Sequence, residues 1–376
     1  MHHLLEHGAD LEAQLDDYST PLHIAAYNGK VAVVQSLLDY GTNIQAHRKD
    51  LCTPLHTALW SGNPSAMQLL LEHGADLEAQ LDNHRTPLHI AACSGEVAAV
   101  LLLLDHGANI QAHCKDLCIA LHAASWSGNS NVLQLLLEHG ADLEAQLDDC
   151  STPLFVVAYN GKLAAVRSLL NHGMNIQACC GDLWTPLHAA SCSGNLDIVR
   201  ILLERGADLE AQSDDHSTPL HVASECGNVD AVRSLLDHGA NIHAQCEDLW
   251  TPLHAALCSG SPDVIRLLLE YSADLDAQLD DHSTPLHIAA ENGKVDAVQV
   301  LLKHGSITHV WDSNGWTPLH NASSRQYLNI IELLLGDGVD IDVQDNQQRT
   351  PLQLAICEGE MEAPQLLLER GANPYV

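Results

Sequence analysis

The stretch TPLHIAAENGKVDAVQVLLKHG, residues 284–305, decides the fold, because near copies of it recur along the whole chain. Its opening Thr, or the replacement of that Thr, returns every 33 residues without an insertion, at Thr20, Thr53, Thr86, Ile119, Thr152, Thr185, Thr218, Thr251, Thr284, Thr317 and Thr350. A fixed step of this length is the signature of a repeat array, in which each short unit is one structural layer. We therefore predict a stack of similar layers rather than a single globular enzyme.

Each copy of the repeat predicts a pair of short helices. In the first copy, Thr20 is suited to cap a helix that starts at Pro21, and Gly29 ends that helix with a positive-φ turn. The second helix ends before Gly41 and carries apolar residues at a spacing that buries one face, namely Val31, Val33, Val34, Leu37 and Leu38. Helices of about eight residues are not stable alone, so neighbouring pairs must hold them.

The repeated unit resembles the ankyrin repeat, whose signature includes Thr-Pro-Leu-His-x-Ala-Ala, a following Gly and later Leu-Leu-Leu-x-x-Gly-Ala-Asp. The resemblance covers essentially the whole chain. It implies an all-α fold, an α-solenoid of stacked helix pairs with β-hairpin-like tips, wound into a curved superhelix. It predicts repeats at residues 16–48, 49–81, 82–114, 115–147, 148–180, 181–213, 214–246, 247–279, 280–312, 313–345 and 346–376.

Residues 1–15 are expected to be the end of a partial repeat, since HLLEHGADLEAQ matches only the final part of the unit. No polar capping repeat covers the first full layer, although solenoids need such caps for solubility. Two interpretations stay open: the chain is a piece of a longer protein, or its first layer has another cover.

A second period of 66 residues lies over the first through about residue 312. Tips of the form LDDHSTPLH alternate with tips of the form KDLCTPLH or EDLWTPLH. This pattern indicates tandem duplication of a pair of repeats. Similarity between alternate repeats is therefore weak evidence of function.

The composition favours an intracellular protein made of thin helical layers. Apolar residues make up 46% of the chain and aromatic residues 4%, so the core is built from Leu, Ala, Val and Ile. No apolar run approaches the roughly 18 residues of a membrane span, and no signal peptide precedes the first repeat. We expect a cytoplasmic or nuclear location, whereas the sequence does not indicate an oligomeric state.

The 12 cysteines are interpreted as free thiols of a reducing compartment. Cys114, Cys180 and Cys246 occupy one repeat position at steps of 66 residues, too far apart for a disulfide or a shared metal ion. Local pairs such as Cys114 with Cys118 lack the second ligand pair of a zinc site. We expect no metal site and no cofactor.

The net charge of −33 argues against a nucleic-acid partner, because the surface repels phosphate. Pairs of acidic residues recur at the tips, as in Asp16-Asp17, Asp148-Asp149, Asp214-Asp215 and Asp280-Asp281. Two interpretations are equally supported. The tips attract a basic protein segment, or they keep a long apolar stack soluble.

The 25 histidines follow the repeat rather than a catalytic pattern. Nine are the fourth letter of the motif, from His23 to His320, and seven more precede the second Gly, as His73 precedes Gly74. The resemblance implies that a motif histidine ties its helix start to the tip. The triplet Asp214-Asp215-His216 lies on a tight turn, where adjacent residues rarely converge on one ion. No phosphate loop or nucleophile elbow is present, so we expect no enzyme activity.

Recognition is the remaining role, and the resemblance implies that partners meet the tips and the ends of the first helices. Seven residues after the Thr, at the end of the first helix, the chain has large rings in its first half and Glu225 and Glu291 in its second half. Directly before the Thr, on the tips, large rings stand only in the second half. The predicted partner-binding residues are Tyr27, Trp60, Trp126, Tyr159, Trp184, Glu225, Trp250, Glu291 and Trp316. The alternative is that each ring only packs on a neighbouring layer or was copied by duplication.

Some repeats depart from the family pattern. Only DSNGWT, residues 312–317, keeps both the Asp and the Gly of the usual tip, so the other tip turns are expected to differ in geometry. Ile119 and Ala120 remove the cap and the proline from the fourth repeat, and Pro364 should disturb the first turn of the last helix. We expect the fourth repeat and the last two repeats to be the least stable.

Two functional classes fit these observations. The first is a protein-interaction scaffold or adaptor that holds a partner, such as a basic segment or a folded domain, in its concave groove. The second is the sensing or substrate-recruiting arm of a larger regulator, such as a ubiquitin-ligase receptor or a signalling switch, whose effector domain lies elsewhere.

Overall fold

A computed structural model describes residues 10–357 and 359–375. The chain forms two compact units, Met1–Gly181 and Asp182–Val376. Most of the partial repeat expected at residues 1–15 lies outside the described residues. In each full repeat, a first helix of seven or eight residues is followed by a second helix of eight or nine residues.

The described helices follow the 33-residue step. In the N-terminal unit they are α2 (Pro21–Tyr27), α3 (Val31–Asp39), α4 (Pro54–Trp60), α5 (Pro64–Glu72), α6 (Pro87–Ser94), α7 (Val97–Asp105), α8 (Ala120–Ser127), α9 (Ser130–Glu138), α10 (Pro153–Tyr159) and α11 (Leu163–Asn171). In the C-terminal unit they are α12 (Pro186–Ser193), α13 (Leu196–Glu204), α14 (Pro219–Glu225), α15 (Val229–Asp237), the 3₁₀-helix η1 (Glu247–Leu249), α16 (Pro252–Ser259), α17 (Pro262–Glu270), α18 (Pro285–Glu291), α19 (Val295–Lys303), α20 (Pro318–Ser324), α21 (Leu328–Gly336), α22 (Pro351–Cys357) and α23 (Glu362–Glu369).

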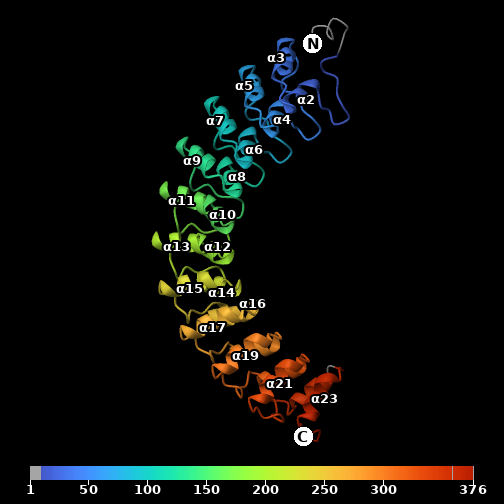
Figure 1. Ribbon diagram of the computed structural model, residues 1–376, viewed down its shortest axis with the longest axis vertical. Coiled ribbons are helices and arrows are strands. Elements are labelled where there is room, and N and C mark those ends of the chain that lie inside the picture. The colour runs from blue at the N-terminus through green and yellow to red at the C-terminus, as the bar shows by residue number, and fades with distance from the viewer. Residues whose placement is uncertain (1–9, 358, 376) are drawn as a thin grey trace. The chain divides into compact units, whose positions relative to one another are not determined.

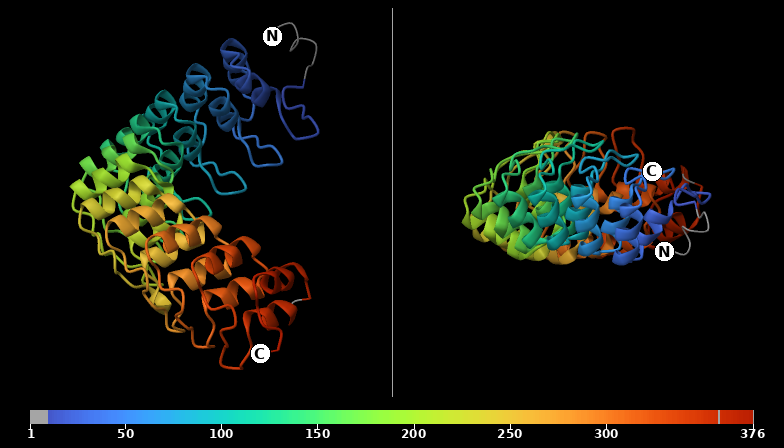
Figure 2. Two further views of the ribbon diagram at one scale, coloured as in Figure 1. Left: turned by 60° about the horizontal axis from the view of Figure 1, so that its bottom comes forward. Right: turned by 90° about the horizontal axis from the view of Figure 1, so that it is seen from above.

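Within each unit, every helix pair packs on the pairs beside it. In the N-terminal unit α2 contacts α4 and α4 contacts α6, while the second helices α3 and α5 contact each other. The first helices therefore form one row and the second helices another, and the long loops between pairs extend beside them (Figures 1 and 2). The predicted all-α stack of helix pairs is confirmed.

The Thr-Pro-Leu-His motif starts the first helices through a reciprocal pair of hydrogen bonds. In α2, the Thr20 side chain accepts the backbone N–H of His23, and Nδ1 of His23 accepts the backbone N–H of Thr20 at 3.2 Å. This is a capping box in which histidine replaces the usual Glu or Gln. The same pair of bonds starts α4, α6, α12, α14, α16, α18 and α20.

The core of each layer is aliphatic. Leu22 and Ala26 of α2, together with Val34 and Leu37 of α3, are at most 1% exposed. Val33 is 39% exposed, so the predicted buried face of α3 is narrower than the sequence indicated. In the described residues, no helix combines the length and the apolar character needed to cross a membrane.

Most tip turns share one geometry although they lack glycine. Leu51 takes φ +61° and Gly315 takes φ +79°. The N–H of Leu51 donates to the carbonyl of Arg48 at 3.0 Å, and the N–H of Gly315 donates to the carbonyl of Asp312 at 2.9 Å. Positive φ is also found at Tyr18, His84, Leu117, Cys150, Leu183, His216, Leu249 and His282. The expected difference in tip geometry is wrong for most of these turns, because their backbone bonds outweigh a left-handed cost of about 1–2 kcal/mol. It is found at the eighth tip, where Glu247–Leu249 form η1 and Asp248 also takes a positive φ, +57°.

The atypical repeats keep their helices. Helix α8 starts at Ala120 without a hydroxyl cap; the N–H of Ile119 still donates to Nδ1 of His122, at 3.4 Å. Ile119 is fully buried, which offsets the lost cap. Pro364 is the third residue of α23, where a backbone N–H has no partner within the helix, so the helix continues beyond it.

Candidate protein-interaction surface

The motif histidines are used in hydrogen bonds between layers. Nε2 of His23 lies 3.0 Å from the carbonyl oxygen of Cys52, the residue before the next Thr. Because Nδ1 of His23 accepts the Thr20 N–H, the proton of the ring is on Nε2 and is donated to that carbonyl. The same bond to the next tip is made by His89, His188, His221, His287 and His320. The structural role that the family resemblance implied is confirmed for these residues.

Burial keeps the motif histidines neutral. It lowers the pKa of His23, His89, His221, His287 and His320 below the ordinary value of 6.5. It lowers the pKa of His56, His122, His188 and His254 further, to about 4. Protonation of Nδ1 would remove the acceptor on which the helix start depends, so these rings are suited to structure rather than to proton transfer with a substrate.

The histidines at the ends of the second helices cap those helices. Nδ1 of His73 lies 2.8 Å from the carbonyl oxygen of Leu69, one turn earlier. His106, His139, His172, His238 and His304 make the same contact. This placement confirms the predicted position at the second-helix C-terminus.

In the acidic pairs at the tips, one member has a structural role. The second carboxylate shapes the turn: Asp17 accepts the backbone N–H of Ser19 at 3.0 Å and its hydroxyl at 2.7 Å, and these bonds lower the pKa of Asp17. Asp215 likewise accepts hydrogen bonds from Ser213 and Ser217. The first member of each pair is exposed, namely Asp16, Asp148, Asp214 and Asp280. Asp149, Asp215 and Asp281 are exposed as well, so both carboxylates of these pairs can meet a partner.

Four of the predicted rings form a row on the N-terminal unit, which we call the aromatic row. Tyr27, Trp60, Trp126 and Tyr159 are 58%, 46%, 39% and 53% exposed, in that order. Each lies in the last turn of a first helix, α2, α4, α8 or α10, and these helices belong to one continuous stack through α6. Cys93 of α6, which is also exposed, stands between Trp60 and Trp126 in the row.

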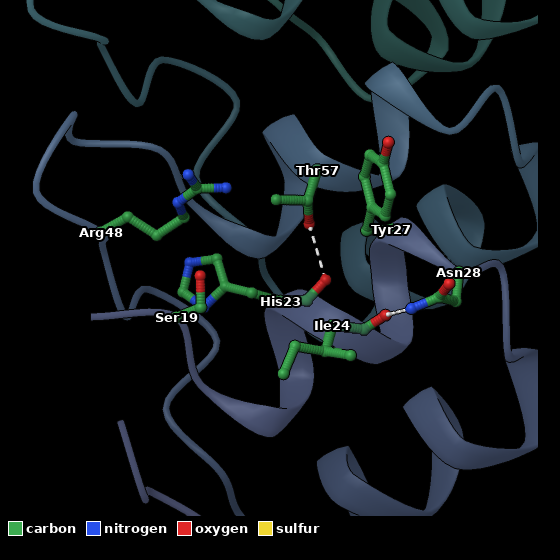
Figure 3. A pocket seen from close by; sticks show the side chains of 7 residues that line it. All are labelled: Ser19, His23, Ile24, Tyr27, Asn28, Arg48 and Thr57. Carbon is green, nitrogen blue, oxygen red and sulfur yellow. Dashed lines mark hydrogen bonds between the residues drawn. The ribbon is translucent and has the colours of Figure 1, made fainter. Parts of the chain in front are cut away.

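A pocket of about 190 Å³ lies beside the first ring of the row. Tyr27 and Ile24 of α2 line it on one side and Arg48 of the next tip lies on the other (Figure 3). Thr57 of α4 donates to the carbonyl of His23 at 3.2 Å and fixes the two first helices there. Drug-sized ligands occupy roughly 300–1,000 Å³, so this pocket is suited to one side chain of a larger partner.

The tip rings of the C-terminal unit have partners within the fold. Trp184, Trp250 and Trp316 are half-buried, and their ring centroids lie 5.9, 6.0 and 6.5 Å from those of the histidines four residues later. Nε1 of Trp316 also donates to Asp345 at 3.2 Å. A structural role for these rings is visible, while their predicted role in binding stays a prediction.

The two predicted glutamates differ in their surroundings. Glu225 is exposed at the end of α14, whereas Glu291 at the end of α18 pairs with Arg325 at 2.8 Å. Both members of that pair are largely exposed, so it contributes little to stability. Glu225 is the more accessible acidic contact.

One cluster of buried metal-ligating side chains is present in the described residues: His89, Cys114 and Cys118. Their ligand atoms lie within 4.8 Å of one another. However, Nδ1 of His89 accepts the N–H of Thr86, and Nε2 lies 2.8 Å from the Cys118 carbonyl oxygen. A metal ion would have to displace one of these bonds, so the cluster fits a structural role better than a metal site.

Sequence reasoning missed two parts of this surface. Ile24 is 43% exposed beside Tyr27, whereas Ile90 at the same repeat position is 7% exposed, so repeat position alone does not reveal it. Arg48 of the next tip also lines the pocket. The same position is occupied by Cys114 and Cys180 in the tips that lie 66 and 132 residues later. A basic residue in a chain of net charge −33 is the signal that could have drawn attention to Arg48.

Comparison with known proteins identifies relatives of the whole chain. A family model described as ankyrin repeats, in three copies, matches residues 1–81, 77–147, 144–213, 210–279, 272–345 and 312–376. Among solved structures, the chain is similar to the human ASB11 ankyrin repeat domain, with 29% sequence identity and a TM-score of 0.56. That similarity covers 60% of this chain and 100% of the other. No curated protein matches significantly.

Proposed function

This chain belongs to the ankyrin repeat family, and from that premise we propose that it is a non-catalytic scaffold or adaptor that binds a partner protein along its first-helix ends and tips. The observation that carries the proposal is the aromatic row, whose four rings are 39–58% exposed. Exposed rings gathered in this way are typical of interaction sites, since Trp and Tyr provide most of the energy of many interfaces.

The row and its pocket suggest how a partner is held. The rings give flat apolar contacts on four of five successive layers, and the pocket beside Tyr27 accepts one side chain at the end of the row. Polar side chains also line that pocket, namely Ser19, His23, Asn28, Arg48 and Thr57. A partner that spans several layers is therefore favoured over a small molecule.

The charge of the chain favours a basic partner segment. Exposed carboxylates such as Asp16, Asp148 and Glu225 attract lysine and arginine, and the net charge of −33 repels nucleic acid. The exposed edges of Trp184, Trp250 and Trp316, together with Glu291, are secondary contacts in this proposal. Because all 12 cysteines are free, we place the protein in a reducing compartment, the cytoplasm or the nucleus.

The alternative function is the recruiting or sensing arm of a larger regulator, such as a ubiquitin-ligase receptor or a signalling switch. The solved relative supports this alternative in one respect, since it is described as an ankyrin repeat domain of human ASB11, a part rather than a whole protein. Both functions use the same surface. They differ in whether an effector domain is joined to it.

The test is to capture partners with the intact chain and then titrate a purified partner. Replacing both rings in Trp60→Ala/Trp126→Ala should weaken binding at least about 100-fold, since each anchor is worth roughly 2 kcal/mol. Trp311→Ala is the matched control, because Trp311 is 56% exposed but lies outside the aromatic row. An unchanged affinity of the double variant would contradict the proposal.

A further inference from the structure

Two thiols of neighbouring repeats meet on the C-terminal unit. Cys192 lies in the last turn of α12, and Cys226 directly follows the last residue of α14. The S–H of Cys226 donates to Sγ of Cys192, and the two sulfur atoms are 3.2 Å apart. Cys226 is exposed and Cys192 is half-buried, so a small reagent in solution can reach the pair.

The backbones that carry the two thiols are tied together. The side-chain amide of Asn228, two residues after Cys226, donates to the carbonyl oxygens of Ser191 and Cys192 at 2.7 and 2.8 Å. Helices α12 and α14 also pack directly on each other. The short distance between the sulfurs is therefore supported by fixed backbone on both sides.

No other pair of neighbouring repeats has cysteines at these two positions. Cys93 and Cys258 share the repeat position of Cys192, but the residues 34 places later are Ser127 and Asn292. The position of Cys226 holds Ser or Asn in most repeats. The pair is thus a local feature of the sixth and seventh repeats rather than a product of the repeat pattern.

We propose that Cys192 and Cys226 form a redox modification site, at which a hydroperoxide such as hydrogen peroxide joins the two repeats by a disulfide bond. The thiolate of Cys192 attacks one peroxide oxygen, the O–O bond breaks, and a sulfenic acid forms on Cys192 while hydroxide leaves and takes up a proton as water. The thiol of Cys226 then attacks that sulfur. The S–S bond forms, the S–O bond breaks, and the second oxygen leaves as water with the proton of Cys226.

With hydrogen peroxide, two thiols and one peroxide give one disulfide and two molecules of water, and two electrons pass from sulfur to peroxide. The sulfurs must approach by about 1 Å to reach the S–S bond length of about 2.05 Å. Rotation of two short side chains on fixed backbones supplies that movement. A dithiol reductant restores the two thiols by exchange.

The surroundings assign different roles to the two sulfurs. The S–H of Cys226 donates to Sγ of Cys192, and burial and that neighbouring thiol raise the pKa of Cys226, so Cys226 holds its proton and acts second. Cys192 is then the residue that meets the peroxide. The order of the two steps can be read from single substitutions.

The experiment treats the intact chain with hydrogen peroxide and maps its peptides without reduction. Wild type and the control Cys93→Ser should give a peptide pair linked through Cys192 and Cys226, about 2 Da lighter than the two reduced peptides and separated again by dithiothreitol. Cys226→Ser should stop at a sulfenic acid on Cys192, trapped by a 1,3-diketone reagent. Ser259 holds the equivalent position in the next repeat, so a serine at 226 is compatible with the fold.

Two results would overturn the inference. One is oxidation of Cys192 and Cys226 to separate acids without a link in the wild type. The other is a peroxide reaction that links different cysteines while these two stay reduced. Circular dichroism of Cys192→Ser and Cys226→Ser verifies that both variants keep their helices, so a missing link is attributable to the missing thiol.

Discussion

The same repeat places its large rings in two different environments in the two units. In residues 10–181, Trp60 and Trp126 end first helices and are 46% and 39% exposed. In residues 182–375, Trp184 and Trp250 stand before the motif Thr and pack against His188 and His254. A ring that precedes the Thr is half-buried. A ring at the helix end stays largely exposed even where it has a ring neighbour in its own repeat, as Trp126 has His122 at 6.5 Å and Tyr159 has Phe155 at 6.3 Å between ring centroids. Ring content alone therefore does not locate a binding surface, because the position within the repeat decides how exposed the ring is.

The largest predicted effect is a loss of stability at acid pH, caused by the buried motif histidines that both units contain. His56 and His122 in one unit, and His188 and His254 in the other, have their pKa lowered from 6.5 to about 4. The unfolded chain therefore binds more protons between these values, so stability is full above about pH 6.5 and falls as the pH drops toward 4. The loss is on the order of 3 kcal/mol for each such histidine.

Urea unfolding at pH 7 and at pH 5 measures this effect. His254→Gln should unfold with a smaller pH dependence than the wild type. Glutamine can accept the N–H of the N-cap residue, as Gln353 does for Thr350 at 3.0 Å, but it does not titrate. Equal urea midpoints of the wild type at the two pH values would show that these histidines are not held neutral by the fold.

The second predicted effect is that the half-buried tip rings contribute more to the free energy of unfolding than the exposed rings at helix ends. Trp250→Ala removes a half-buried ring that packs on His254, so the free energy of unfolding should fall by about 2 kcal/mol. Trp60→Ala removes an exposed ring, and the change should stay within about 0.5 kcal/mol. Thermal or urea unfolding of both variants gives the comparison. A larger loss for Trp60→Ala than for Trp250→Ala would invert the assignment of structural and accessible rings.

The smallest effect concerns the strained tips, which both units contain. Leu51 and Leu183 hold φ near +60° and are 41% and 46% exposed, so Leu51→Gly or Leu183→Gly relieves strain at little cost in burial. Each change should raise the free energy of unfolding by roughly 0.5–1 kcal/mol. The matched control is the opposite substitution. Gly315→Ala should lower the free energy of unfolding, since a Cβ there would lie 2.6 Å from the backbone N of Asn346. Destabilisation by the leucine-to-glycine changes would mean that the tips are not strained.

Much of the fold was predictable because it depends on local signals that the repeat multiplies. The Thr and His of the motif start most of the first helices, and the glycines end the helices at the expected places. The turn geometry at Leu51 was not predictable from local preference, because the backbone bonds of the tip override the usual avoidance of positive φ by leucine.

The candidate surface was predictable only in part. The positions of Tyr27 and Trp60 at helix ends followed from the period, and their exposure agrees with that position. The meeting of Cys192 with Cys226, and of His89 with Cys114 and Cys118, depends on how neighbouring layers are aligned. That alignment sets distances between residues about 30 positions apart, which the sequence of one repeat does not contain.

The most direct test of the aromatic row is hydroxyl-radical footprinting of the free chain and of its complex with a captured partner. The account predicts that oxidation of Trp60 and Trp126 falls at least about fivefold in the complex, because an interface core excludes water. Oxidation of Trp311, which is exposed outside the row, should not change. Equal oxidation of Trp60 and Trp126 in the free and bound chain would contradict the account.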